Sequence, residues 1–201
     1  WLVICVGIML SVFQQIVGIN AVLYFAPRIF ESMGVNKPMI FTVIMGVVNI
    51  SFTLLAIYTV EKFGRKPLLI VGSLLMSMGA AGVALINIIT LPAWVAVMSI
   101  LVYSAAFMFS WGPICWVYMS ELFPNTIRSQ ATAIAVAFQW ISNFAVSASF
   151  VPIYNYSHSM VYVIYGVICL VAALFVWKLV PETKGKTLEE ITTMWRERSK
   201  K

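Results

Sequence analysis

Apolar runs long enough to cross a lipid bilayer recur along this chain, separated by short polar segments. The hydrocarbon core is about 30 Å thick, so a spanning helix needs about 20 apolar residues, whereas a barrel strand needs only about ten. Runs of this length therefore predict helices and exclude a membrane barrel. With 62% hydrophobic residues and a mean hydropathy of +0.96, the chain is also too apolar for a soluble domain. We expect an all-α integral membrane protein.

Six spans are predicted, and the first and fourth of them are interrupted. They cover residues 1–33, 39–60, 67–90, 94–120, 127–152 and 158–180. Together they form one six-helix transmembrane bundle over residues 1–180, and residues 181–201 follow as a cytoplasmic tail. Because an apolar run is already under way at Trp1, with no leader ahead of it, we expect the chain to continue a longer protein.

The basic residues indicate how the bundle is oriented. Arg28 and Lys37 lie on one side of the predicted spans, and the other basic residues lie opposite: Lys62, Arg65, Lys66, Arg128 and those from Lys178 onward. By the positive-inside rule, the 61–66 and 121–128 loops and both termini are cytoplasmic. The net charge of +6 is thus a topology signal, and we expect no nucleic-acid partner.

The segment from Ser11 to Pro27 places uncharged polar side chains inside an apolar run, namely Gln14, Gln15, Asn20 and Tyr24. Burying an unpaired amide in hydrocarbon costs roughly several kcal/mol, so these side chains need partners. On an unbroken helix, Asn20 would lie about 140° from Gln15 and about 120° from Gln14. A hinge at Gly18 would let the amides converge near the middle of the membrane, and we take that point as a binding site.

Two other spans carry polar stripes of the same kind. In the second, Asn49 shares a face with Gly46 and Thr53, and Thr53 is equally well explained as a contact between helices. In the fifth, Gln139 is the deepest amide and the best site candidate, whereas Asn143 is equally well explained as structural. The first, second, fourth and fifth spans carry buried polar groups and the third and sixth do not, so we expect those four to line a cavity and these two to lie outside, against lipid.

Pro113 divides the fourth span, because proline removes a backbone donor and clashes one turn back. This predicts a hinge at Gly112 and Pro113. Trp116 follows one turn later on the face of Gly112, which leaves its ring room to meet a ligand. For Trp116 we favour the site over an anchor at the membrane interface, and for Trp111 we favour the anchor over the site.

Chemistry inside the membrane is not expected. The chain has no aspartate, its glutamates lie in loops, at span ends or in the tail, and His158 lies at an outer turn. No acid–base pair, activated nucleophile or proton relay can be assembled, and Cys5, Cys115 and Cys169 are best explained by packing. We therefore expect no enzyme activity, no cofactor and no metal site. Neutral amides and aromatic rings suit an uncharged ligand with many hydroxyls.

Motifs along nearly the whole chain resemble those of the sugar porter family of the major facilitator superfamily. They are F-Q-Q-I-V-G-I-N-A-V-L-Y (13–24), E-K-F-G-R-K-P-L (61–68), S-W-G-P-I-C-W (110–116), S-E-L-F-P-N-T-I-R (120–128), Q-W (139–140) and V-P-E-T-K-G-K-T-L-E-E (180–190). The resemblance implies the C-terminal six of the family's twelve helices, and hence half of a sugar transporter. Such a protein moves a neutral monosaccharide, a pentose such as xylose or a hexose, by alternating access. Coupling to protons, as in a symporter, would reside in the N-terminal six-helix half, which this chain would need as a partner.

The resemblance also implies roles for single residues. Gln14, Gln15, Asn20, Asn49 and Gln139 would hydrogen-bond the sugar, Trp116 would stack near it beside Gly112, and Tyr24 and Trp140 would add an aromatic wall or gate. A cytoplasmic charge cluster that latches the outward-facing state would comprise Glu61, Arg65, Glu121, Arg128 and Glu182. Residues 187–199 would form an amphipathic intracellular helix. The implied location is the inner membrane of a bacterium.

Two other interpretations of the residues stay open. One is a membrane protein that binds or senses sugar without transporting it, and the other is a self-assembling pore-like bundle. The residues do not choose between a pentose and a hexose. Because alternating access needs two bundles that rock against each other, these six spans alone should not complete a transport cycle.

Overall fold

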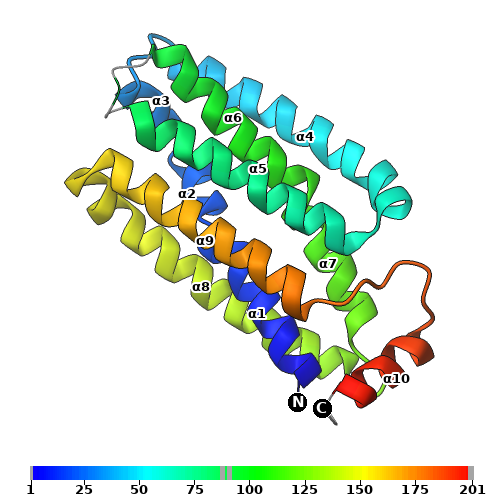
Figure 1. Ribbon diagram of the computed structural model, residues 1–201. Helices are drawn as coiled ribbons and strands as arrows, with labels where there is room; N and C mark the ends of the chain where they lie inside the picture. Colours follow the sequence, from blue (N-terminus) through cyan, green and yellow to red (C-terminus); the bar gives the residue numbers. More distant parts are fainter. Residues whose placement is uncertain (1, 87–88, 90–91, 199–201) are drawn as a thin grey trace.

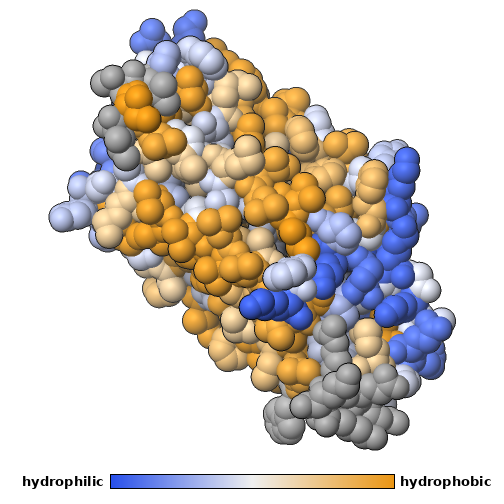
Figure 2. All heavy atoms as spheres, in the orientation of Figure 1, coloured by the Kyte–Doolittle hydropathy of each residue, from blue (hydrophilic) through white to orange (hydrophobic). Residues whose placement is uncertain are grey.

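The computed structural model describes residues 2–86, 89 and 92–198, and these residues contain helices and no strand. Six of the helical segments are long and apolar enough to cross a membrane. They stand side by side in one bundle, and the first and last helices lie at the same end of it (Figure 1). Apolar side chains cover the middle of the bundle, and polar side chains gather at its two ends (Figure 2). The predicted all-α membrane bundle is confirmed.

The first span is three helices in succession: α1 (Leu2–Ile16), α2 (Ile19–Tyr24) and α3 (Ala26–Ser32). It breaks at Gly18, whose φ of 88° and ψ of 10° lie in the left-handed region. Only glycine takes this conformation at little cost, and a Cβ at this position would also overlap the ring of Tyr165. The carbonyl of Val17, at the break, accepts a hydrogen bond from the Tyr103 hydroxyl. Two tyrosines from other spans therefore hold the break in place.

The second and third spans are continuous helices, α4 (Pro38–Phe63) and α5 (Arg65–Ile86), joined by Gly64 alone. Proline begins α4, where its missing N–H removes no helical hydrogen bond. Small residues on α5 allow close packing, since a Cβ on Gly72, Gly79 or Gly82 would collide with atoms of the following span. The third span is thus packed tightly against the fourth.

The fourth span consists of α6 (Ala93–Phe109) and α7 (Trp111–Leu122), and it breaks at Ser110, with φ −128° and ψ −87°. This break lies two residues before the predicted hinge. The ring of a proline clashes with the carbonyl four residues earlier, so Pro113 disturbs the helix near Phe109 and not at its own position. The proline itself then lies in the first turn of α7, where a missing N–H is tolerated.

The last two spans are α8 (Arg128–Tyr156) and α9 (His158–Leu179), and the tail contains α10 (Leu188–Arg198). Helix α10 starts at a capping box, in which the Thr187 N–H donates to the Glu190 carboxylate and the Glu190 N–H donates to the Thr187 hydroxyl. Ile191 and Trp195 bury one face of α10 at the end of the bundle, beside α7. The tail is therefore folded onto the bundle over the residues described.

Candidate binding pocket and charge cluster

A pocket of about 360 Å³ lies at the middle of the bundle, beside both helix breaks. Its walls come from α1, α2, α4, α6, α7 and α8, which belong to the four spans expected to line a cavity, and the described lining includes no residue of α5 or α9. The lining residues are Gln14, Gln15, Asn20, Thr53, Phe107, Met108, Gly112, Pro113, Trp116, Gln139, Trp140 and Asn143. None of these residues carries a charge, so the pocket is polar but neutral.

Gln14 and Gln139 join in one buried hydrogen-bonded chain. The Gln14 Nε2 donates to the carbonyl oxygens of Trp111 at 3.0 Å and of Gly112 at 3.2 Å. The Gln14 Oε1 accepts from the Gln139 Nε2. The Gln139 side chain is 5% exposed, and its Oε1 is buried without a hydrogen-bond partner among the described residues. A buried acceptor left unpaired costs about 1–3 kcal/mol, so this oxygen needs a donor from water or from a ligand.

Gln15 and Asn20 meet across the break at Gly18. The Asn20 Nδ2 donates to the Gln15 Oε1 at 2.6 Å, although an unbroken helix would separate the two side chains by about 140°. The left-handed turn at Gly18 therefore brings both amides to one side of the pocket. Together with the first pair, they supply four carboxamides to a single neutral pocket.

Aromatic rings complete the wall. The side chains of Trp116 and Trp140 are 48% and 63% exposed in this bundle, and both line the pocket. Phe107 is buried beside Gly112, where a Cβ on the glycine would lie 3.3 Å from its ring. Glycine at position 112 thus leaves room for Phe107 and the pocket. Flat apolar faces next to amides suit a ligand with both C–H and O–H surfaces.

Tyr24 and Asn49 are not brought into this lining. Tyr24, the last residue of α2, is 58% exposed. Asn49 is buried, and its Oδ1 accepts a hydrogen bond of 2.6 Å from the Ser104 hydroxyl, which ties α4 to α6. Thr53, one turn further along α4, lines the pocket in its place and donates its hydroxyl to the Asn49 carbonyl.

Phe107 and Met108 line the pocket although the sequence did not single them out. Phe107 and Met108 are apolar residues within an apolar run, so no polar stripe marks them. Their place in the last turn of α6, just before the break, is the one signal that could have found them. Asn143, for which the sequence left a site role and a structural role open, also lines the pocket, one turn after Gln139 on the same face of α8.

Trp111 is not an interface anchor, which corrects the prediction from its position in the span. Its side chain is fully buried, and its indole Nε1 donates to the Ser73 hydroxyl at 2.7 Å and the Leu69 carbonyl at 3.2 Å. An anchor would leave the indole at the water interface. Instead, the N–H is satisfied inside the bundle by α5.

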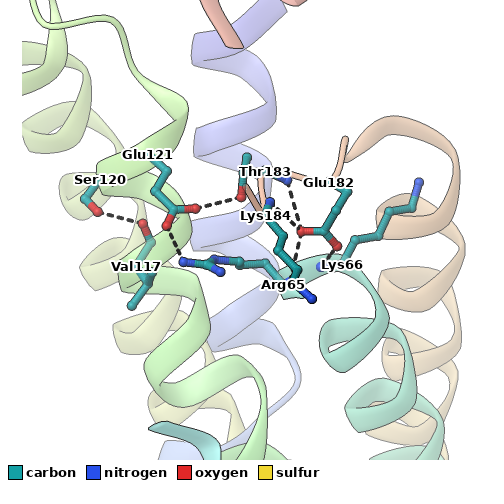
Figure 3. Close-up of polar contacts among 8 residues, drawn as sticks. All are labelled: Arg65, Lys66, Val117, Ser120, Glu121, Glu182, Thr183 and Lys184. Atoms are coloured by element: carbon teal, nitrogen blue, oxygen red, sulfur yellow. Dashed lines mark hydrogen bonds and ion pairs between the residues drawn. The ribbon is translucent and has the colours of Figure 1, made fainter. Parts of the chain in front are cut away.

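A second cluster of polar side chains lies at the end of the bundle that carries α10. The Arg65 Nη2 forms an ion pair of 2.6 Å with the Glu121 Oε1, and the Glu121 Oε2 accepts from the Thr183 hydroxyl at 2.6 Å (Figure 3). Both charged side chains are mostly buried, with 15% and 25% exposed. The pair thus joins the start of α5 to the end of α7 and to the tail.

Glu182 caps α5. Its Oε1 accepts from the Arg65 N–H and its Oε2 from the Lys66 N–H, each at 3.0 Å, and Oε1 also accepts from the N–H groups of Thr183 and Lys184 (Figure 3). Gly64 makes this possible, since it has φ 91° and a Cβ there would lie 2.7 Å from the carboxylate. A carboxylate at a helix N-terminus pairs free N–H groups and opposes the positive end of the helix dipole.

Two residues assigned to this charge cluster are not drawn into it. The Arg128 Nε donates to the Phe123 carbonyl at 3.2 Å, and its Nη2 is buried without a partner among the described residues. Glu61 is exposed and makes no ion pair or hydrogen bond within the described part of the chain. No group of three or more metal-ligating side chains occurs within the same part.

Comparison with known proteins reveals close relatives. A family model described as "Sugar (and other) transporter" matches residues 2–195. The D-xylose-proton symporter of Escherichia coli strain K12 is 50% identical over 208 residues, which cover 99% of this chain and 42% of that protein. The glucose facilitated diffusion protein of Zymomonas mobilis is 40% identical over 203 residues, which cover 96% of this chain and 43% of that protein.

Solved structures agree with this likeness. The inward open conformation of the xylose transporter of Escherichia coli superposes with a TM-score of 0.86 at 52% identity, over 96% of this chain and 42% of that one. A structure of a double tryptophan mutant of a xylose transporter gives a TM-score of 0.90 at 51% identity. The chain therefore spans about two fifths of the length of the relatives that it matches.

Proposed function

This chain belongs to the sugar transporter family of the major facilitator superfamily, and we propose that it forms one half of a sugar carrier. The carrier moves a neutral monosaccharide, a pentose such as xylose or a hexose, by rocking this bundle against a second six-helix bundle. The half-length match to relatives named as symporters and facilitators supports the need for that second bundle. Proton coupling would reside there, since the spans described here carry no acid in the pocket.

The unpaired Gln139 Oε1 is the observation that carries this proposal. It is a buried acceptor in a pocket without charges, which favours a neutral donor such as a ligand hydroxyl as its partner. An anionic ligand would find no countercharge in the lining, and a cation no carboxylate. The pocket volume of about 360 Å³ lies within the range of small-molecule sites.

We assign the sugar contacts to the carboxamides of Gln14, Gln15, Asn20 and Gln139, with Trp116, Trp140 and Gly112 as the wall. Tyr24 is assigned to an outer aromatic gate, which its exposure and its place past the break support. Asn49 is assigned a supporting role: it accepts hydrogen bonds from Ser104 and from Thr53, and Thr53 lines the pocket. Gly18, Gly112 and Pro113 are the proposed hinge residues, which the two helix breaks beside the pocket support.

The charge cluster of Glu61, Arg65, Glu121, Arg128 and Glu182 is proposed as a latch on the outward-facing state. The buried Nη2 of Arg128, which needs an acceptor, supports a partner carboxylate on the second bundle. The protein is a multi-pass membrane protein. We propose the inner membrane of a bacterium, with this end and both termini in the cytoplasm, because most of the basic residues gather here.

The test compares neutral and charged ligands on the purified protein. We expect D-xylose or D-glucose to quench the fluorescence of Trp116 and D-gluconate to leave it unchanged. Gln139→Ala should weaken sugar binding by about 5- to 150-fold, the equivalent of about 1–3 kcal/mol for one lost polar partner. Gln130→Ala is the matched control, because Gln130 is an exposed glutamine on the same helix. Gluconate binding as tight as that of glucose would contradict the proposal.

Transport is tested separately, with the longest product of the gene in proteoliposomes. Uptake of labelled sugar that collapses when the proton gradient is dissipated establishes symport, and uptake that persists establishes facilitated diffusion. Tight binding without any uptake would overturn the carrier and favour a protein that only senses sugar.

A further inference from the structure

Helix α5 lines no part of the pocket within the described residues, yet it is connected to the pocket through Trp111. The Ser73 hydroxyl and the Leu69 carbonyl, both on α5, accept hydrogen bonds from the indole N–H of Trp111. Ser73 is itself 1% exposed and donates to Leu69 at 2.8 Å. The indole is therefore held at a fixed place on α5, deep inside the bundle.

The backbone of the same residue holds the first amide of the pocket. The carbonyl oxygens of Trp111 and Gly112 both face the Gln14 Nε2, so only the NH₂ end of this carboxamide can point toward them. The Gln14 Oε1 must then point the other way, toward Gln139. Since that oxygen is an acceptor, Gln139 presents its NH₂ group to it. The Gln139 Oε1 is therefore the one acceptor of this hydrogen-bonded series that is left without a donor among the described residues.

The direction of two carboxamides is thus fixed by two backbone carbonyls. A carboxamide can turn over and exchange donor for acceptor wherever its neighbours allow it. If the carbonyls of Trp111 and Gly112 moved away, Gln14 could turn over, Gln139 could follow, and the pocket would present an N–H donor where it now presents an oxygen.

The backbone at this point needs outside support, because the helical ladder is interrupted at Ser110. The close approach of α5 supplies part of it, since a Cβ on Gly72 would overlap the Ser110 hydroxyl. The remaining support comes from the hydrogen bonds of the Trp111 indole N–H to Leu69 and Ser73. Trp111 directly precedes Gly112, so these bonds also hold the Gly112 carbonyl. Position and angle of the two carbonyls are therefore set from α5.

We propose that Ser73 and Trp111 are positioning residues that fix the donor and acceptor polarity of the pocket, and through it the hydroxyl pattern of the ligand. Ser73 holds the indole, the indole holds the backbone at the break, and the backbone orients Gln14 and Gln139. The identity of the ligand as a sugar rests on the proposed function, whereas the orientation of the amides does not.

The first test measures this orientation without any sugar. Selective ¹⁵N-glutamine labelling makes the side-chain NH₂ groups visible, including those of the four glutamines of this chain, Gln14, Gln15, Gln130 and Gln139. In the unaltered protein the NH₂ protons of Gln14 and Gln139 should exchange slowly, because they are buried and hydrogen-bonded, and those of exposed Gln130 should exchange fast. Trp111→Phe, which replaces the indole by a smaller aromatic ring and removes its N–H, should speed exchange at Gln14 and Gln139 by about tenfold, the equivalent of one lost hydrogen bond.

The second test uses deoxyfluoro sugars, in which fluorine accepts weakly but cannot donate. One position on the sugar should bind Gln139, and its fluoro analogue should bind the unaltered protein about tenfold or more weakly than the parent sugar. In Trp111→Phe and Ser73→Ala this ratio should shrink by about threefold or more, because the pocket can then offer a donor. Ser73→Thr keeps the hydroxyl and should restore the ratio. Trp177→Phe, at an exposed tryptophan of α9, is the control.

Each outcome separates the two proposals. Unchanged exchange at Gln14 and Gln139 in Trp111→Phe overturns the positioning role, whatever the ligand. A loss of sugar affinity with an unchanged fluoro-to-parent ratio also overturns it, since a purely structural defect weakens both ligands alike. Altered exchange in a protein that binds no neutral sugar supports the positioning role and refutes the proposed function.

Discussion

Single residues set the two breaks in this bundle, and each break depends on what a neighbouring span places against it. Gly18 combines a left-handed backbone with the Tyr165 ring in contact, and Pro113 disturbs the carbonyl one turn before it. Beside these breaks, Asn20 hydrogen-bonds Gln15 and Gln139 hydrogen-bonds Gln14. At this scale, backbone geometry decides which amides can meet.

Gly18→Ala should lower the thermal stability of the purified protein by an amount equivalent to at least about 2 kcal/mol. The new Cβ would cost about 1 kcal/mol in a left-handed backbone and would also collide with Tyr165. Gly34→Ala is the matched control, because Gly34 has φ 78° with nothing within 4 Å, and so reports the backbone cost alone. Equal losses in the two variants would show that the contact with Tyr165 does not matter.

Whole elements are joined at the charged end by groups at helix termini. The Glu182 carboxylate closes the first turn of α5, while Arg65 links the same turn to the end of α7. The segment between α9 and α10 thus connects α5 and α7, which belong to the third and fourth spans. The first residues of the tail are therefore an integral part of the folded bundle.

Glu182→Gln should destabilise the bundle by about 0.5–2 kcal/mol. The amide oxygen can keep some of the N–H contacts, but the negative charge that opposes the dipole of α5 is lost. The midpoint of thermal unfolding in detergent is the measurement. Glu61→Gln, at an exposed carboxylate near the same turn, should leave the midpoint unchanged. A larger drop of the unfolding midpoint in Glu61→Gln than in Glu182→Gln would contradict the role of Glu182 as the cap of α5.

The whole molecule shows two kinds of surface. Helices α5 and α9 pack along each other, whereas α4 and α8 leave most of their length exposed, including large apolar side chains such as Val47, Ile50, Ile141 and Phe144. Such faces suit either lipid or a second bundle of the same kind. Both of these exposed helices contribute to the pocket lining, α4 through Thr53 and α8 through Gln139, Trp140 and Asn143, which fits the proposed carrier of two halves.

Thiol labelling checks the packing of the bundle as a whole. Cys5 is exposed, whereas Cys115 and Cys169 are fully buried, so one of the three thiols should react with a membrane-permeant maleimide in the folded protein. All three should react after denaturation. Mass spectrometry of the labelled peptides identifies the site. Rapid labelling of Cys115 under native conditions would show that α7 is not packed as described.

The sequence alone predicted the membrane, the six spans, the break at Gly18 and the neutral amides, because each follows from local chemistry. Run length, glycine, proline and the cost of a bare amide in hydrocarbon need no knowledge of neighbours. It also grouped the four spans that line the pocket, three through their polar stripes and the fourth through Pro113 and Trp116. It misassigned Trp111, since nothing in its own span reveals Ser73 on another.

Only the tertiary structure decided which amide keeps a free oxygen, why Asn49 turns to Ser104, and how α5 reaches a pocket that it does not line. These outcomes depend on contacts between residues far apart in the chain, such as Gln14 with Gln139. The same carboxamide can donate or accept, so its chemistry is fixed by the partner that folding places beside it. That partner is a property of the fold and not of the local sequence.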